Sequence, residues 1–205
     1  MKRAIANILL NTQAVFLSPE KPFRWASGIM SPIYCDNRRV LAFPKERDAI
    51  KQQLAQVLEA YEYDAIMGTA TAGIPMASIL ADYVNKPLGY VRSSQKAHGR
   101  NQQIEGFHQP GSKVVVIEDL ISTGKSVLEV VDVLEKAEME VVAVVGIFSY
   151  QLQAAKEAFQ QRNLTYVTLS DFETLTQVAL ETNRITQANV EQLKAFQTDP
   201  TGWQA

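Results

Sequence analysis

The sequence predicts an α/β fold in which a mostly parallel central sheet is flanked by helices. Two observations carry this prediction. First, short apolar stretches alternate along the chain with amphipathic stretches of helical period, and this alternation is typical of layered folds with right-handed crossover connections. Second, the segments KVVVIED (113–119) and VVAVVGIF (141–148) contain Val and Ile without polar alternation. Such runs indicate strands that are buried on both faces, as in a parallel sheet.

The N-terminal part is expected to contain a helix, a small hairpin and a second helix. Apolar residues recur with helical period over residues 2–15, and this helix should end before Pro19. Segment 22–39 combines a Ser-Gly turn with short β-prone pieces, which predicts a hairpin. Pro44 suits a first helical position, so a helix is expected over 44–61.

The rest of the chain reads as strand–helix units. The expected strands are 64–68, 88–91, 113–119, 141–148 and 165–169, and the expected helices are 74–84, 125–137, 151–162 and two more within 171–197. Residues 92–111 have no periodicity and contain both histidines, three basic residues and three glycines. A loop of this length inside a compact domain is usually functional or disordered.

Composition and charge exclude several classes of protein. The chain has 205 residues, of which 46% are hydrophobic and 20% charged, as in ordinary globular proteins. Its 20 basic and 22 acidic residues give a net charge of -2, which does not support a nucleic-acid partner. No apolar run approaches the ~20 residues of a membrane span, and Asn7, Asn11 and Gln13 interrupt any signal core. A single cysteine, Cys35, excludes an internal disulfide and a cysteine-rich zinc site. We therefore expect a cytoplasmic protein with no membrane or nucleic-acid partner and no metal ligated by its own side chains.

The segment VVVIEDLISTGKSV has the features of a phosphate site. Glu118 and Asp119 stand at the carboxyl end of a buried strand, and a turn of small residues, 122–126, leads into a helix. Ligands of parallel sheets bind outside the carboxyl ends of strands, and helix N-termini bind anions. A nucleoside-triphosphate P-loop would need a glycine where Asp119 stands. Two carboxylates would repel a triphosphate but accept hydrogen bonds from vicinal hydroxyls, so the pattern favours a sugar phosphate. The alternative is that the two acids only cap the following helix.

This segment also resembles the signature of the type I phosphoribosyltransferases. These enzymes bind 5-phosphoribosyl-1-pyrophosphate (PRPP) and exchange its pyrophosphate for a nitrogen base. The resemblance implies that the carboxylates orient the ribose, that the turn holds the 5′-phosphate and that Asp119 is catalytic. The residues it assigns to PRPP binding here are Glu118, Asp119, Leu120, Ile121, Ser122, Thr123, Gly124, Lys125 and Ser126.

Segment 22–39 is similar to the N-terminal hood of the orotate phosphoribosyltransferases. A hairpin of this kind can cover a flat acidic pyrimidine, and the resemblance implies that Tyr34 and Ser122 bind orotate. Met30 stands where this family usually carries a lysine, and Tyr150 stands where some members place an arginine near orotate. The matching residues are Phe23, Ser27, Gly28, Ser31, Pro32, Tyr34, Asp36, Asn37 and Arg38.

Two loops complete the resemblance. The segment MGTATAGIPMA (67–77) is similar to the pyrophosphate loop of the same enzymes, with Thr69, Ala70, Thr71, Ala72 and Gly73 as its anion-binding residues; some orotate enzymes carry a lysine in place of Ala72. In the unassigned segment, Arg92, Lys96, His98 and Gly99 match the R-x-x-x-K-x-H-G pattern of the mobile catalytic loop, whereas His108 is expected at the surface. The resemblance implies that Arg92, Lys96 and His98 bind PRPP, with Lys96 and His98 catalytic. Cations at this point would neutralise the departing pyrophosphate.

The resemblance spans nearly the whole chain. It implies a type I phosphoribosyltransferase-like fold in which residues 1–205 form one domain, with hood elements within about 1–40 and the C-terminal tail. The implied reaction is orotate plus PRPP giving orotidine 5′-monophosphate and pyrophosphate, a step of pyrimidine (UMP) biosynthesis. It further implies Mg²⁺ held mainly through PRPP, and a homodimer with shared active sites. Two alternatives stay open: a phosphoribosyltransferase for another base, and a PRPP-sensing, non-catalytic regulator on the same fold.

Overall fold

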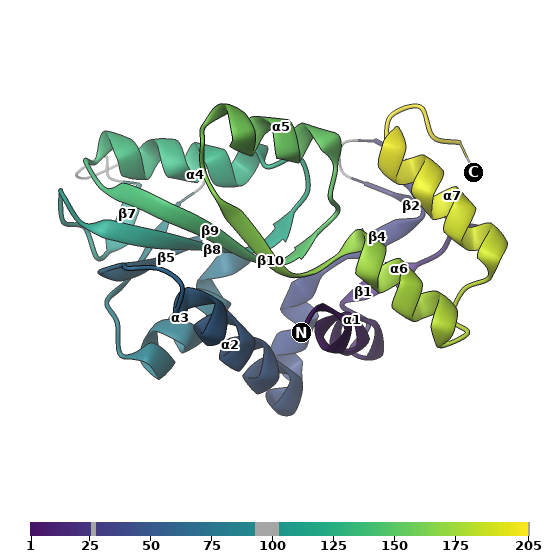
Figure 1. The fold of residues 1–205 in the computed structure, drawn as a ribbon, viewed down its shortest axis with the longest axis horizontal. Helices are drawn as coiled ribbons and strands as arrows, with labels where there is room; N and C mark the ends of the chain where they lie inside the picture. The colour runs from purple at the N-terminus through teal and green to yellow at the C-terminus, as the bar shows by residue number, and fades with distance from the viewer. Residues whose placement is uncertain (26–27, 93–102, 205) are drawn as a thin grey trace.

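A six-stranded sheet with helices on both faces forms the centre of the computed structural model, which describes residues 1–25, 28–92 and 103–204 (Figure 1). The strand order is β10-β9-β8-β5-β6-β7, and all neighbouring strands are parallel except the edge pair β6–β7. Its strands are β5 (Ala65–Thr69), β6 (Leu88–Val91), β7 (Ile104–Gly106), β8 (Lys113–Ile121), β9 (Glu140–Ser149) and β10 (Tyr166–Asp171). The predicted α/β fold with a mostly parallel sheet is therefore confirmed.

Two helical layers enclose the sheet (Figure 1). The helices are α1 (Lys2–Asn11), α2 (Pro44–Leu58), α3 (Gly73–Val84), α4 (Lys125–Lys136), α5 (Gln153–Gln161), α6 (Phe172–Glu181) and α7 (Gln187–Thr198), with a 3-10 helix η1 (Asn37–Ala42). Helices α4 and α5 cover one face of the sheet, and α2 and α3 cover the other. Val127, Val131 and Leu134 form the buried stripe of α4, as their helical spacing predicts.

The hood, defined here as residues 15–25 and 28–37, consists of two small antiparallel pairs and the first residue of η1. β1 (Val15–Leu17) pairs with β4 (Ile33–Cys35), and β2 (Phe23–Arg24) pairs with β3 (Met30–Ser31). Trp25 stacks on Tyr150 after β9 with ring centroids 5.4 Å apart, and its ring meets Phe196 of α7 edge-on at 5.7 Å. These contacts attach the hood to both the sheet and the C-terminal tail. One cluster of buried side chains runs from α1 through the sheet to α7.

Several bounds differ from the sequence prediction by up to three residues, as at the end of α2 (Leu58 rather than residue 61), and two segments differ more. The first helix ends at Asn11 rather than at residue 15, because Gln13 has a left-handed φ of 55° and Val15 begins β1. Residues 92–111 were expected to form a loop, but Ile104 of β7 is buried and pairs with Val91 of β6. The ladder continues one step further, since the Arg92 amide donates to the Gln103 carbonyl at 2.8 Å. A lone apolar residue in a polar segment gave no periodic signal for this strand.

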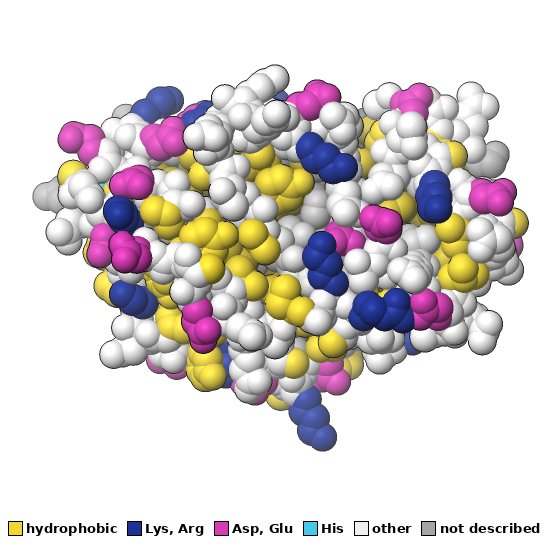
Figure 2. All heavy atoms as spheres, viewed as in Figure 1, with side chains coloured by type: hydrophobic (Ala, Val, Ile, Leu, Met, Phe, Trp, Pro, Cys, Tyr) yellow, Lys and Arg dark blue, Asp and Glu magenta, His cyan; other side chains and the backbone are white. Residues whose placement is uncertain are grey.

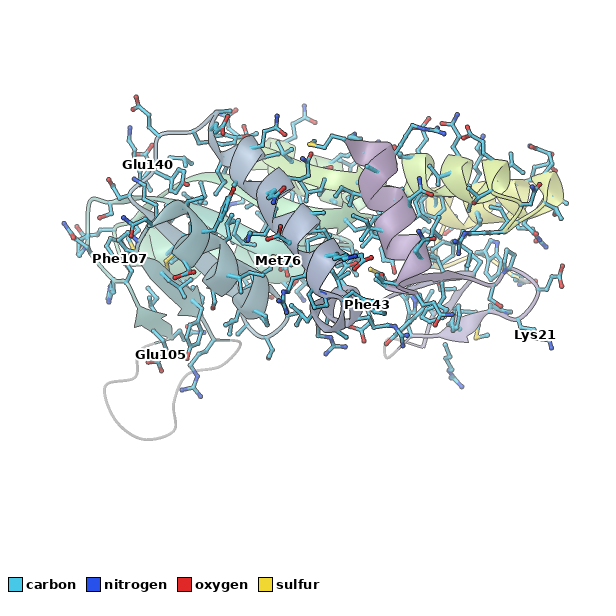
Figure 3. The ribbon with its side chains drawn as sticks, turned by 90° about the horizontal axis from the view of Figure 1, so that it is seen from below. Lys21, Phe43, Met76, Glu105, Phe107 and Glu140 are labelled. Carbon is cyan, nitrogen blue, oxygen red and sulfur yellow. The ribbon has the colours of Figure 1, made fainter. Side chains whose placement is uncertain are left out.

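The surface carries charges of both signs. On the face drawn in Figure 2, basic and acidic side chains are interspersed, and hydrophobic side chains gather left of centre, where Figure 1 shows the sheet. Figure 3 views the α2–α3 side, with Glu105 and Phe107 at the β7 end of the molecule and Lys21 at the hood end. Among the described residues, no helix is long and apolar enough to cross a membrane.

Candidate active site

Three polar segments meet at the carboxyl edge of the sheet. The first turn, residues 69–73, follows β5, while the acidic pair, Glu118 and Asp119, and the second turn, residues 122–126, lie at the end of β8 and beyond. Because β5 and β8 are parallel neighbours, their carboxyl ends lie side by side. A cavity of about 570 Å³ contains residues of all three segments in its wall, among them Thr71, Asp119 and Ser122.

Glu118 is the buried member of the acidic pair. Glu118 is only 6% exposed, and its Oε1 accepts hydrogen bonds from the Thr69 hydroxyl at 2.7 Å and from the Asp119 amide at 2.9 Å. Burial, followed by the hydrogen bond and the charge of Asp119, raises the pKa of Glu118 to about 8. Glu118 is therefore mostly protonated at neutral pH, and it can donate a hydrogen bond as well as accept one.

Asp119 is the cavity-facing member of the pair. It is half-buried and lines the cavity, while its backbone carbonyl accepts a hydrogen bond from the Asn37 side-chain amide at 2.6 Å. The alternative that the two acids cap the next helix is wrong, because α4 begins after Gly124 and has no side-chain cap. The pair is therefore available to a ligand.

The second turn presents small polar groups to solvent. Thr123, Lys125 and Ser126 are exposed, Ser122 is half-buried, and the turn leads directly into the twelve-residue helix α4. Gly124 has a left-handed φ of 81°, which L side chains rarely adopt. A second cavity, of about 390 Å³, lies over this turn. Exposed hydroxyls and the amide groups of a helix N-terminus suit a phosphate.

The first turn packs closely against β8. A Cβ on Gly73 would lie 2.5 Å from the Ile117 carbonyl oxygen and would also overlap the Thr69 hydroxyl. Glycine is therefore required here for the approach of the two backbones. Thr71 is exposed beside the cavity, and Ala70 and Ala72 are half-buried. The small side chains of this turn and its exposed Thr71 suit an anion, whereas its other threonine, Thr69, donates its hydroxyl to Glu118.

The hood lies alongside the acidic pair. Burial is the main cause that raises the pKa of Cys35 and of Tyr150, and the charge of Asp119 contributes to both shifts. The Tyr34 phenol also contributes to the shift of Tyr150, so it belongs to the same neighbourhood. Tyr34 itself is 40% exposed and packs on Phe23 with ring centroids 5.6 Å apart.

The remaining predicted residues differ in where the structure places them. Arg92 lines the cavity and forms an ion pair with Glu105 at 3.5 Å, and Leu120 also lines the cavity. Ile121, in contrast, is fully buried and its carbonyl accepts the Tyr150 amide, so its side chain is part of the core. Lys96, His98, Gly99 and Ser27 lie outside the described residues. His108 is exposed, as expected.

Sequence reasoning missed several groups at this site. Glu129, Asp132 and Lys136 of α4 line the cavity, and their three- and four-residue spacing on one helix was an available signal. Tyr150 is 3% exposed and stacks on Trp25, so it forms part of the floor beneath the hood. A wider depression of about 1090 Å³ lies beside Tyr63 and Lys113, at the amino ends of the strands, and contains none of the three polar segments.

The comparison with protein families identifies the class first. A family model described as "Phosphoribosyl transferase domain" matches residues 36–180, which include the acidic pair and both turns. Among curated relatives, the orotate phosphoribosyltransferase of Bacillus subtilis (strain 168) is 50% identical over 202 residues, which are 98% of this chain and 94% of the relative. This chain therefore belongs to the orotate phosphoribosyltransferase family.

Solved structures agree with this assignment. Orotate phosphoribosyltransferase from Aeropyrum pernix superposes with a TM-score of 0.75 at 30% identity, covering 88% of this chain and 98% of that one. The UMP synthase of Leishmania donovani superposes with a TM-score of 0.83 at 30% identity, covering 95% of this chain. That protein is longer, and the match spans 42% of its length. The predicted type I phosphoribosyltransferase fold is confirmed.

Proposed function

We propose that this chain transfers the 5-phosphoribosyl group of PRPP to orotate, giving orotidine 5′-monophosphate and pyrophosphate. The observation that carries the proposal is the acidic pair of β8, which lies between two anion-binding turns and beneath a hood in a chain of the orotate phosphoribosyltransferase family. In the reaction, the bond between the anomeric carbon and the pyrophosphate oxygen breaks. A bond between the same carbon and a ring nitrogen of orotate forms, and the proton of that nitrogen is released to solvent.

The three polar segments suit the three parts of PRPP. The exposed hydroxyls and amides of 122–126 would hold the 5′-phosphate, and residues 69–73 would hold the pyrophosphate. Asp119 would accept hydrogen bonds from the ribose hydroxyls, with Glu118 behind it, as positive charge develops on the sugar ring. Fixed polar groups of this kind stabilise a transition state without reorganising, so positioning and electrostatics account for the catalysis.

The base and the leaving group would be bound from the hood and from the loop that follows β6. Tyr34, exposed in the middle of β4, and Ser122 would contact orotate. Arg92 would turn from Glu105 toward the pyrophosphate, and Lys96 and His98 would add catalytic cations. The support for Lys96 and His98 is the R-x-x-x-K-x-H-G pattern alone.

Mg²⁺ would reach the site with PRPP. It dehydrates reluctantly, so it would be held by oxygen atoms of PRPP and by water, with the half-buried Asp119 carboxylate as an acceptor for its water ligands. When bound, Mg²⁺ neutralises part of the charge of the pyrophosphate. We further propose that residues 1–205 act as one phosphoribosyltransferase domain, that the reaction serves pyrimidine synthesis, and that it takes place in the cytoplasm.

An ultraviolet assay tests the reaction directly. Purified protein is mixed with PRPP, Mg²⁺ and orotate, and parallel samples contain adenine or hypoxanthine in place of orotate. We expect orotate to disappear while pyrophosphate accumulates, with no consumption of the purines. Turnover of a purine would favour a phosphoribosyltransferase for another base. PRPP binding without turnover of any base would favour the regulator, although the net charge of -2 does not support a nucleic-acid partner.

The homodimer with shared sites has its own test. Lys96→Ala and Asp119→Asn variants, each nearly inactive alone, are mixed, mildly denatured and refolded together. If Lys96 acts in the partner's site, each heterodimer has one site with both defects and one with neither. Random pairing should then restore roughly a quarter of wild-type activity. No recovery despite demonstrated subunit exchange would contradict shared sites and leave the reaction unaffected.

A further inference from the structure

Asn37 connects the hood to the acidic pair. It is the first residue of η1, two positions after β4, and it is only 3% exposed. Its side-chain Nδ2 donates to the backbone carbonyl of Asp119 at 2.6 Å, a contact between residues 82 positions apart in sequence. The hood therefore contacts the end of β8 through a buried hydrogen bond.

Side chains hold both backbone polar groups of Asp119. Its amide donates to Glu118 Oε1 at 2.9 Å, and its carbonyl accepts from Asn37. Glu118 is in turn held by the Thr69 hydroxyl of the first turn. The pairing of Glu118 and Leu120 with β9 fixes the course of this strand, and two further contacts, one from the first turn through Glu118 and one from Asn37, act on the Asp119 backbone itself.

The other end of the Asn37 amide shows that the donor is the useful group. Oδ1 of Asn37 is buried and has no hydrogen-bond partner among the residues that the structure describes. Leaving a buried acceptor unpaired costs about 1–3 kcal/mol, so stability alone disfavours an amide at this position. The reversed amide would place Oδ1 against the Asp119 carbonyl, which is also an acceptor, so the observed orientation is the favourable one. The unpaired acceptor lowers stability, so the presence of Asn37 is better explained by the effect of its hydrogen bond on Asp119.

We propose that Asn37 is a positioning residue for phosphoribosyl transfer, holding the Asp119 carbonyl so that the acidic pair faces the ribose. This inference rests on the proposed function. It assigns to Asn37 no contact with substrate. Small displacements of a positioned group, of about 1 Å, can lower the rate of an enzyme by about a hundredfold.

A matched control exists on the neighbouring strand. The side-chain Nε2 of Gln197 donates to the backbone carbonyl of Tyr150, directly after β9, at 3.0 Å. This bond has the same chemistry as that of Asn37, an amide donating to a carbonyl at a strand end. Gln197 does not line the cavity that contains the acidic pair. Gln197→Ala therefore measures the loss of an amide–carbonyl bond at a strand end that does not carry the acidic pair.

The test compares Asn37→Ala and Gln197→Ala in stability and in steady-state kinetics with orotate and PRPP. We expect both variants to unfold at lower denaturant concentration than the wild type. Asn37→Ala should lose about ten- to a hundredfold in kcat, with the KM for orotate little changed. Gln197→Ala should keep kcat within about twofold of the wild type. A folded Asn37→Ala variant with wild-type kcat would overturn the inference.

A double-mutant cycle separates positioning from a general structural effect. If Asn37 acts through Asp119, Asn37→Ala should lower kcat by less than about twofold in the Asp119→Asn background. Fully additive losses would overturn the inference. If Asn37→Ala does not fold, Asn37→Leu is used in the same cycle, because it keeps the approximate size of the side chain and removes the donor without adding a charge. An inactive wild type would contradict the proposed function, whereas an active wild type with additive losses would contradict only the role of Asn37.

Discussion

The two turns at the carboxyl edge of the sheet have similar residue types but differ in burial and in the reason why each needs glycine. Both follow adjacent parallel strands, and both contain glycine and residues with hydroxyl groups. In the first turn, Thr69 is 4% exposed, and Gly73 is needed because two backbones approach each other. In the second turn, Thr123 is exposed, and Gly124 is needed because its φ is 81°. The first turn supports the acidic pair from behind, and the second turn faces outward.

This difference shows that the same residue types can serve stability at one position and binding at another. A hydroxyl that is bonded to a buried carboxyl contributes to folding, whereas an exposed hydroxyl contributes to the affinity for a ligand. Substitutions of the buried Thr69 and Gly73 should therefore be detected by denaturation, and those of the exposed Thr123 by kinetics. The acidic pair lies between the turns, and its two members should differ. A substitution of Glu118 should be detected by denaturation, and one of Asp119 by kinetics.

Asp119→Asn should have the largest effect on activity. The side chain lines the cavity, so its replacement should leave the fold intact and remove a charge that faces the ribose. Losses at such electrostatic groups are about a hundredfold or more in kcat. The measurement is kcat with orotate and PRPP beside the unfolding midpoint in urea. Wild-type turnover by a folded Asp119→Asn protein would contradict the assignment of the acidic pair.

Glu118→Gln should change the dependence of stability on pH. The pKa of Glu118 is about 8 in the folded protein and near the ordinary value of 4.5 when unfolded. Between these values the folded state holds a proton that the unfolded state has lost, so wild-type stability falls as pH rises. Glutamine does not titrate. Relative to the wild type, Glu118→Gln should therefore gain roughly 3 kcal/mol between pH 5 and pH 8. Parallel stability curves for the two proteins over this range would contradict a protonated Glu118.

The sequence was sufficient for the strand–helix order because the signals were local. The unbroken Val and Ile of β8 and β9, and the Pro44 start of α2, required no tertiary information. The end of α1 and the position of β7 were missed for the opposite reason. Val15 suits a helix or a strand, and only its pairing with Cys35 decides between them. Ile104 becomes part of a strand only when Val91 lies beside it.

The candidate site follows the same rule. The acidic pair and both turns were predicted because each is contiguous in the sequence and lies at a strand end. The contact between Asn37 and Asp119 joins residues 82 positions apart, and the raised pKa of Glu118 depends on its burial. Neither property is encoded in local spacing, so both required the structure.

Gly73→Ala and Gly124→Ala compare the two reasons for glycine. A methyl group at residue 73 would lie 2.5 Å from the Ile117 carbonyl oxygen, so two backbones must separate. Overpacking of this kind costs about 1–3 kcal/mol, occasionally more. At residue 124 the left-handed φ costs about 1–2 kcal/mol, and the nearest atom is 3.0 Å away on the Phe159 ring. Urea unfolding should show the larger loss for Gly73→Ala. Equal losses would mean that the first turn is not closely packed against β8.

Thr69→Val and Thr123→Val sharpen the comparison with the smallest expected effects. Valine keeps the shape of threonine and removes the hydroxyl. At residue 69 this removes the 2.7 Å bond to Glu118 inside the protein, which should cost about 1–2 kcal/mol of unfolding free energy. It should also raise the pKa of Glu118 further, since the Thr69 bond lowers it.

At residue 123 the side chain is exposed, so stability should change by no more than about 0.5 kcal/mol. The KM for PRPP should instead rise several-fold, because the second turn would lose a phosphate donor. Measuring both quantities on both variants gives a crossed result if the turns differ as described. If Thr123→Val lost stability and Thr69→Val lost only PRPP affinity, the roles assigned to the two turns would be reversed.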